Sequence, residues 1–126
     1  MKIAVSCTGQ TLESTLDPRF GRADFFLVID DKTKEFHVVE NRARLETGGA
    51  GIAAAQLLLD RGIDAVITGQ IGPNALAVLA SSDVRLFQGL ADSVRANLEA
   101  FEEKRLASIK NSGPTHAGTE NKEVRP

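Results

Sequence analysis

The sequence is poor in cysteine, with one residue, Cys7, among 126. A lone cysteine excludes a disulfide within the chain, and the start Met1-Lys2-Ile3 is typical of a strand rather than of a signal peptide. No stretch reaches the roughly 20 apolar residues that a membrane-spanning helix needs. We therefore expect a cytoplasmic protein that has no membrane partner.

An excess of charge of either sign is also missing, because 15 basic and 17 acidic residues leave a net charge of -2. This balance argues against a nucleic-acid-binding surface. Patterns for metal binding and catalysis are absent too: there is no CxxC or HxxxH motif, and His37 and His116 lie in a predicted hairpin and a predicted tail. With no Ser/His/Asp or Cys/His arrangement, we expect a protein that is not an enzyme.

The chain has the content of one ordinary domain, with 42% hydrophobic residues over a length too short for two. Strands are predicted at Lys2–Ser6, Phe25–Ile29, Glu35–Glu40, Ala65–Ile67 and Val84–Gln88, and helices at Ala50–Arg61, Asn74–Ser81 and after a cap at Asp92 or Ser93. This order predicts an α/β domain over residues 1–108, with a mixed sheet of about five strands and helices on its faces. The polar residues 109–126 have little to bury and are predicted to form a disordered tail.

The helix and strand in the middle of the chain are predicted to form the core. The helix Ala50–Arg61 places Ile52, Ala55 and Leu59 on one face, with Leu58 adjoining it. The following strand, Ala65–Ile67, has no polar alternation, which is typical of a strand covered by helices on both faces. We therefore expect this strand to be central and almost completely buried.

Two glycine-rich turns, Thr47–Gly51 and Thr68–Asn74, each lead into a predicted helix. Free N–H groups at a helix start, with glycines that let a ligand approach, make both turns candidate anion cradles. Pro73 suits a first helical position, where its missing N–H costs nothing. Neither turn has the GxxxxGK[ST] or GxGxxG pattern, so the alternative that the glycines only allow tight turns stays open.

The segment Cys7–Arg22 shows no helical or strand periodicity, and connections of this length are usually functional or mobile. It contains Asp17-Pro18-Arg19-Phe20-Gly21-Arg22, in which two arginines flank an aromatic residue and a glycine. These arginines are suited to bind an anion, and a pair with Asp17 that only fixes the loop is equally open. Cys7, at the end of the first strand, is either a soft metal ligand or a small buried residue.

Four segments resemble the dinitrogenase iron-molybdenum cofactor biosynthesis family: KIAVS, DPRFGRADFFLVID, GGAGIAAAQLL and DAVITGQIGPNALAVL. The resemblance covers residues 1–104, and the family includes NifX-like proteins and the C-terminal domain of some NifB proteins. It implies a three-layer α/β fold with the ribonuclease H-like motif and a mixed five-stranded sheet. Nuclease activity is not implied, because that chemistry needs an acid on the first strand and KIAVS has none.

The resemblance also implies a non-enzymatic accessory or carrier protein that binds an iron-sulfur or iron-molybdenum cofactor precursor during metallocluster biosynthesis. Its partners would be the proteins that donate and accept the cluster, and the chain is expected to be a monomer or a weak homo-oligomer. An iron-sulfur site made by one chain normally uses about four thiolates, so a cluster here would be shared, preassembled or held mainly by pocket contacts. A metal-free regulatory module that binds a small anion or phosphate is the alternative, and a protein-interaction domain is the third.

The expected pocket combines the long loop with the two glycine turns. Its cofactor-binding residues are expected to be Cys7, Thr8, Asp17, Arg19, Phe20, Arg22, Gly48, Gly49, Gly51, Gly69, Gly72 and Asn74. The arginines would balance the charge of a cluster, and backbone amides would donate hydrogen bonds to its sulfides. Cys7 and His37 are the candidate iron ligands, although His37 equally suits an ordinary strand face.

Overall fold

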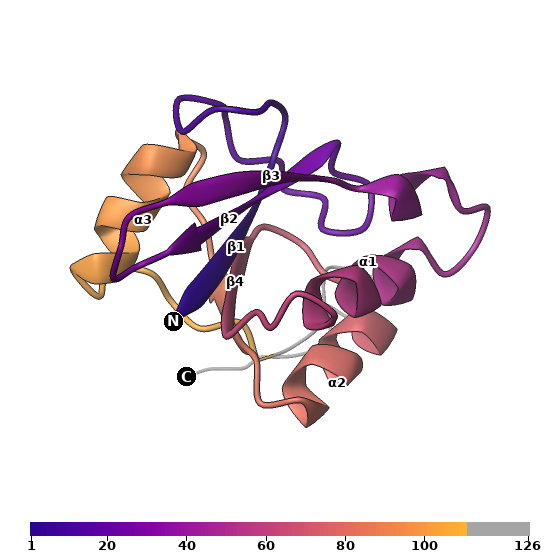
Figure 1. Cartoon of the computed structure of the whole chain (residues 1–126). Coiled ribbons are helices and arrows are strands. Elements are labelled where there is room, and N and C mark those ends of the chain that lie inside the picture. The colour runs from indigo at the N-terminus through magenta and orange to yellow at the C-terminus, as the bar shows by residue number, and fades with distance from the viewer. Residues whose placement is uncertain (111–126) are drawn as a thin grey trace.

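The computed structural model describes residues 1–110, which form an α/β fold with helices packed on a sheet (Figure 1). Its elements in chain order are β1 (Lys2–Cys7), β2 (Phe25–Asp30), β3 (Phe36–Glu40), the short 3₁₀ helix η1 (Arg42–Leu45), α1 (Ala50–Leu59), β4 (Ala65–Thr68), α2 (Pro73–Ser81), β5 (Arg85–Gln88) and α3 (Val94–Glu102). The predicted order of strands and helices is confirmed. The η1 helix was not predicted, because a single turn of four residues has no periodicity to reveal it.

The five strands form one mixed sheet in the order β3-β2-β1-β4-β5. β2 pairs antiparallel with both β1 and β3, whereas β4 lies parallel to β1 and to β5. The hairpin of β2 and β3 needs only the polar turn after Asp30, while each parallel pair needs a crossover that carries a helix. The sheet is therefore antiparallel on one side of β1 and parallel on the other, and the predicted mixed sheet is confirmed.

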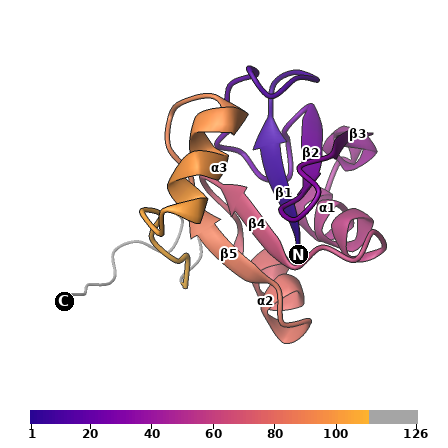
Figure 2. The ribbon, with the colours of Figure 1, turned by 60° about the vertical axis from the view of Figure 1, so that its left-hand side comes forward.

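Successive strand residues point into two separate cores, one on each face of the sheet. Ala4, Val28 and Val66 pack with the buried side chains of α1 and α2, including Leu58 and Leu79. A second set packs toward α3 on the opposite face and consists of Ile3, Val5, Cys7, Leu16, Leu27, Ile29, Ala65, Ile67 and Val94. Figures 1 and 2 show α1 and α2 on one side of the sheet and α3 on the other. Helix, sheet and helix thus make three layers, as expected.

The buried face of α1 agrees with the expected one only in part. Ala55 and Leu58 are fully buried and Leu59 packs against the core, as expected, whereas Ile52 is 42% exposed and lies outside the core. Almost every position of this helix is apolar, so the periodicity of the sequence does not select one face. Contacts with α2 and η1 decide which face is covered.

Residues after α3 return to the edge of the sheet. The N–H of Gln88 donates to the carbonyl of Ala107 at 2.7 Å, and the N–H of Ile109 donates to that of Leu86 at 2.8 Å. Ile109 was expected in the tail but packs against the core that α1 and α2 cover. The remaining tail prediction, for residues 111–126, lies outside the described residues. Within residues 1–110 no helix has both the length and the apolar composition to cross a membrane.

Replacing Ile67 by alanine tests the buried central strand. Because Ile67 is fully buried in β4, we expect Ile67→Ala to lower the free energy of unfolding by roughly 2 to 5 kcal/mol. Leu45→Ala is the control: Leu45 is 73% exposed, and its truncation should change that free energy by less than about 0.5 kcal/mol. Denaturant titration measures both values. Equal effects of the two changes would contradict the buried position of β4 between β1 and β5.

Candidate functional site

The long loop after β1 is held against the sheet by backbone hydrogen bonds. The N–H of Asp17 donates to the carbonyl of Ser6 at 2.9 Å, and the N–H of Phe20 donates to that of Gln70 at 3.1 Å. The Phe20 ring is buried and packs on Phe26, with ring centroids 5.4 Å apart. The loop therefore crosses the carboxyl ends of β1 and β4, where parallel α/β sheets commonly bind ligands.

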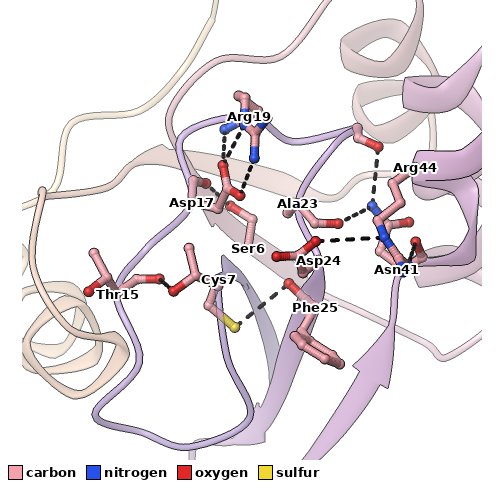
Figure 3. A network of polar contacts seen from close by, with 12 residues as sticks. Ser6, Cys7, Thr15, Asp17, Arg19, Ala23, Asp24, Phe25, Asn41 and Arg44 are labelled. Atoms are coloured by element: carbon pink, nitrogen blue, oxygen red, sulfur yellow. Dashed lines mark hydrogen bonds and ion pairs between the residues drawn. The ribbon is translucent and has the colours of Figure 1, made fainter.

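Arg19 forms a bidentate ion pair with Asp17 (Figure 3). Its Nε and Nη2 donate to Oδ1 and Oδ2 of Asp17 at 3.1 and 2.9 Å, and the backbone N–H of Arg19 donates to Oδ1 at 2.9 Å. Burial acts to raise the pKa of Asp17, but these bonds outweigh it, and the pKa lies below its ordinary value. The Asp17 side chain is 2% exposed and the Arg19 side chain 62%. Arg19 thus fixes the loop from its outer side.

A surface cavity of about 310 Å³ lies where the end of this loop meets the first turns of α1 and α2. It is lined by Gly21, Arg22, Gly49, Ala50, Gly51, Ile52, Gly72, Pro73, Asn74 and Ala75. The two glycine turns and the second arginine of the loop, which are far apart in the sequence, meet here.

Glycines let these three segments approach closely. A Cβ atom at Gly21 would lie 2.9 Å from the backbone nitrogen of Gly51, which is closer than such atoms come in proteins. A Cβ atom at Gly51 would lie 3.3 Å from the Cβ of Ala75. Gly49, the residue before α1, has a φ of 74° that suits glycine. The floor of the cavity is therefore mainly backbone.

Both helices begin at the cavity without a side-chain cap. The first intrahelical bonds are donated by the N–H groups of Ala53 and Leu76, to the carbonyls of Gly49 and Gly72. The N–H groups before them have no partner within their own helix. Each helix start also carries roughly half an elementary positive charge from the aligned peptide dipoles. Two such starts facing one cavity favour an anion.

Arg22 adds a full positive charge to the cavity wall. Its Nη1 donates to the backbone carbonyls of Arg44 and Glu46 at 2.6 and 2.9 Å. Over residues 1–110, no carboxylate lies within ion-pair distance of Arg22. Arg44, by contrast, lies 3.6 Å from a carboxylate oxygen of Asp24 and 3.7 Å from one of Glu40. Within residues 1–110 the charge of Arg22 is therefore not balanced by a carboxylate.

Cys7 and His37, the expected iron ligands, are not brought together. Cys7 is fully buried toward α3, and its Sγ donates to the carbonyl of Gly9 at 3.3 Å. Burial raises the pKa of the Cys7 thiol to about 11, so it is protonated at neutral pH. His37 is exposed on β3 and is paired with Val28 of β2. Val28 belongs to the core under α1 and α2, whereas Cys7 belongs to the core under α3. In the described part of the chain, no three His, Cys, Asp or Glu residues are placed to hold a metal ion.

The expected site residues divide into two groups. Those that line the cavity are Arg22, Gly49, Gly51, Gly72 and Asn74. Those outside its wall are Cys7, Thr8, Asp17, Arg19, Phe20, His37, Gly48 and Gly69. Gly69 instead allows the loop after β1 to pack closely against the end of β4, because a Cβ atom at Gly69 would lie 2.6 Å from the Cα of Pro18. Gly21 was missed, although its place between Phe20 and Arg22 could have signalled it.

Comparisons with known proteins agree with this architecture. A family model described as dinitrogenase iron-molybdenum cofactor matches residues 1–104. The apo form of the orange protein from Desulfovibrio gigas is 33% identical, and the match covers 90% of this chain and 96% of that chain with a TM-score of 0.86. A NifB-like protein from Thermotoga is 28% identical, with coverages of 89% and 98% and a TM-score of 0.77. An uncharacterized protein of Methanocaldococcus jannaschii is 28% identical over 109 residues, covering 84% of this chain and 89% of the relative.

The close approach at Gly21 can be tested by adding one methyl group. We expect Gly21→Ala to lower the free energy of unfolding by about 1 to 3 kcal/mol, because the new Cβ meets the backbone of Gly51 and not a flexible side chain. Gly48→Ala is the matched control, since a Cβ at Gly48 would meet nothing within 4 Å. Thermal or denaturant unfolding measures both. If the two variants were equally stable, the loop and α1 could not be packed as closely as the structure has them.

The Asp17 pair predicts a specific pH dependence of stability. The pKa of Asp17 in the folded state lies below its ordinary value of 3.8, so the stabilisation is complete above that value and is lost as the pH falls through the folded-state pKa. Asp17→Asn should therefore be less stable than wild type at neutral pH, with a difference that narrows below about pH 4. Denaturant titrations of both proteins across this range measure the difference, and a gap independent of pH would exclude the ion pair as its cause.

Proposed function

The chain belongs to the dinitrogenase iron-molybdenum cofactor family, and we propose on that premise that it is a non-enzymatic carrier of a metallocluster precursor. Its cargo is an anionic iron-sulfur or iron-molybdenum cofactor precursor, bound in the cavity between Arg22 and the first turns of α1 and α2. The observation that carries the proposal is the meeting, at one open cavity, of two uncapped helix starts and a guanidinium that has no carboxylate partner within residues 1–110.

The chemistry of the cavity wall favours an anion with several acceptor atoms. Backbone N–H groups at the starts of α1 and α2 point outward from fixed positions, so they need no reorganisation to bind. The guanidinium of Arg22 uses Nη1 for the carbonyls of Arg44 and Glu46, and no hydrogen bond engages its Nε or Nη2 within residues 1–110. These donors suit the sulfides or oxygens at the surface of an anionic cluster.

The lining residues also indicate how a cluster would be held. None of them is a cysteine or histidine, and the one cysteine of the chain is buried and protonated elsewhere. The protein is therefore proposed to bind a cluster that arrives complete with its own ligands. Hydrogen bonds and charge would hold it, without a bond from protein to metal. Such binding suits a carrier, because release to an acceptor protein breaks no metal-ligand bond.

A metal-free module that binds phosphate or a similar small anion is the second candidate. Helix starts with free N–H groups are common phosphate sites, and no lining side chain distinguishes a sulfide from an oxygen. The two functions differ in their cargo and therefore in colour, because an iron-sulfur or molybdenum-sulfur anion absorbs visible light and phosphate does not.

The test compares uptake of a coloured thiometallate by the wild type and by charge variants. Tetrathiomolybdate is a suitable probe, because it is a small dianion that already has all its sulfur ligands. Arg22→Gln is expected to raise its dissociation constant by roughly ten- to hundredfold, the value of one hydrogen bond to a charged group. Titration followed by visible absorbance measures this, and transfer of an iron-sulfur cluster from a donor protein extends the test to a larger cargo.

Two controls locate the effect. Arg61→Gln removes the same charge at the other end of α1. It also removes a hydrogen bond like those of Arg22, because Arg61 Nη1 donates to the backbone carbonyl of Leu57 at 3.1 Å. Cys7→Ser removes the buried thiol. Both variants should bind the probe like the wild type. Equal binding by wild type and Arg22→Gln would refute the charged cavity, and binding of inorganic phosphate in preference to thiometallate would favour the metal-free module.

A further inference from the structure

Asn41 is a fully buried polar residue directly after β3, and it contacts the loop that carries Arg22 (Figure 3). Its Nδ2 donates to the carbonyl of Ala23 at 2.8 Å and to the carbonyl of Gly21 at 3.2 Å. These two carbonyls stand on either side of Arg22 in the chain. One side-chain amide thus holds the backbone on both sides of the arginine that lines the cavity.

The orientation of the Asn41 amide is determined by these acceptors. Turning the amide over would bring Oδ1 against two carbonyl oxygens, so Nδ2 must face them. Oδ1 is then left buried without a hydrogen-bond partner in the described part of the chain. An unsatisfied buried acceptor is destabilising, and such groups are rare in native structures. What this side chain contributes is the pair of hydrogen bonds from Nδ2 to the loop at Arg22.

The backbone of Asn41 holds the other contact of Arg22. The Asn41 carbonyl accepts from the Nη1 of Arg44 at 2.8 Å and from the N–H of Arg44 at 3.2 Å, which fixes the start of η1. The end of η1 presents the carbonyls of Arg44 and Glu46, and these accept from the guanidinium of Arg22. Asn41 therefore fixes Arg22 in two ways. Its side chain holds the backbone of the residues on either side of Arg22, and its backbone holds η1, whose carbonyls accept from the Arg22 guanidinium.

We propose that Asn41 is a positioning residue of the anion cavity, which keeps the Arg22 guanidinium at the wall formed with α1 and α2. This role rests on the proposed function of the cavity, since it matters only if an anion binds there. Asn41 does not touch the anion. It lowers the freedom of the loop, so that binding does not have to order Arg22.

The experiment is a double-mutant cycle on the affinity for tetrathiomolybdate. Asn41→Leu removes the amide and keeps a similar volume, and it is expected to weaken binding by about tenfold. If Asn41 acts through Arg22, the same change made in the Arg22→Gln protein should have little further effect, because the arginine it positions is gone. Asn41→Ser, whose hydroxyl is too short to reach both carbonyls, repeats the measurement in a smaller and still polar side chain.

Asn97→Leu is the matched control. Asn97 is also fully buried, and its amide holds another loop by contacts with the backbone of Leu90, Asp92 and Ser93, away from the cavity. The Asn97→Leu change should lower the free energy of unfolding in denaturant titration while leaving the affinity for tetrathiomolybdate unchanged.

The possible outcomes separate this role from the proposed function. Wild-type affinity in both Asn41 variants, with or without reduced stability, would show that Asn41 is only structural, and the charged cavity would stand. Losses that add fully in the double variant would also overturn the role, because Asn41 would then act independently of Arg22. Failure of the wild type to bind the probe, or inorganic phosphate, would overturn the proposed function and the positioning role with it.

Discussion

The parallel pairing of β1 with β4 is the constraint on which the rest of the structure depends. Both strands are covered on two faces, so their residues are almost entirely buried and their register is fixed by two cores at once. The long loop and the turn into α2 leave the carboxyl ends of these strands together. Because α1 must pack beside α2 on the same face, its start reaches the same rim. The cavity is thus a consequence of how the sheet is covered.

Three arginines near this rim have different partners and therefore different uses. Arg19 is bound to the buried carboxylate of Asp17, and Arg44 lies beside Asp24 and Glu40. In the described part of the chain, the hydrogen bonds of the Arg22 guanidinium go only to carbonyl oxygens, which orient it without neutralising it. Ion pairs at the surface contribute little to folding, which applies to the pairs of Arg44, whereas the pair of Arg19 involves a buried carboxylate and also stabilises the fold. Arg19 and Arg44 fix the surrounding chain, and Arg22 has no carboxylate partner within residues 1–110.

The buried thiol limits the chemistry that the chain can offer. A cysteine on the inner side of β1 packs as a small apolar residue, and its raised pKa keeps it from acting as a thiolate. The donors that remain near the rim are backbone amides and guanidinium groups. Both recognise the outside of an anion and neither binds a metal ion.

Local signals in the sequence determined the elements and several of their ends. The apolar run Ala65–Ile67 predicted the buried strand, and Pro73 predicted the start of α2. Ser93 was one of two predicted caps, and its side chain accepts from the N–H of Ala96. These features depend on a few consecutive residues, and local backbone preferences are sufficient to reveal them.

The tertiary structure alone decided which of the expected site residues line the cavity and which only fix the surrounding chain. Arg19 and Arg22 look alike in the sequence, and only contacts with Asp17 and with η1 assign one to the loop and the other to the cavity. Likewise, the inward position of Cys7 and the buried face of α1 depend on which segments cover them. The partners of Arg22 lie 22 and 24 residues away along the chain, whereas Asp17 lies two residues from Arg19 and a pair with it was already one of the two alternatives that the sequence left open. No local pattern chooses between those alternatives or specifies the distant contacts, so packing selects among arrangements that the sequence leaves equal.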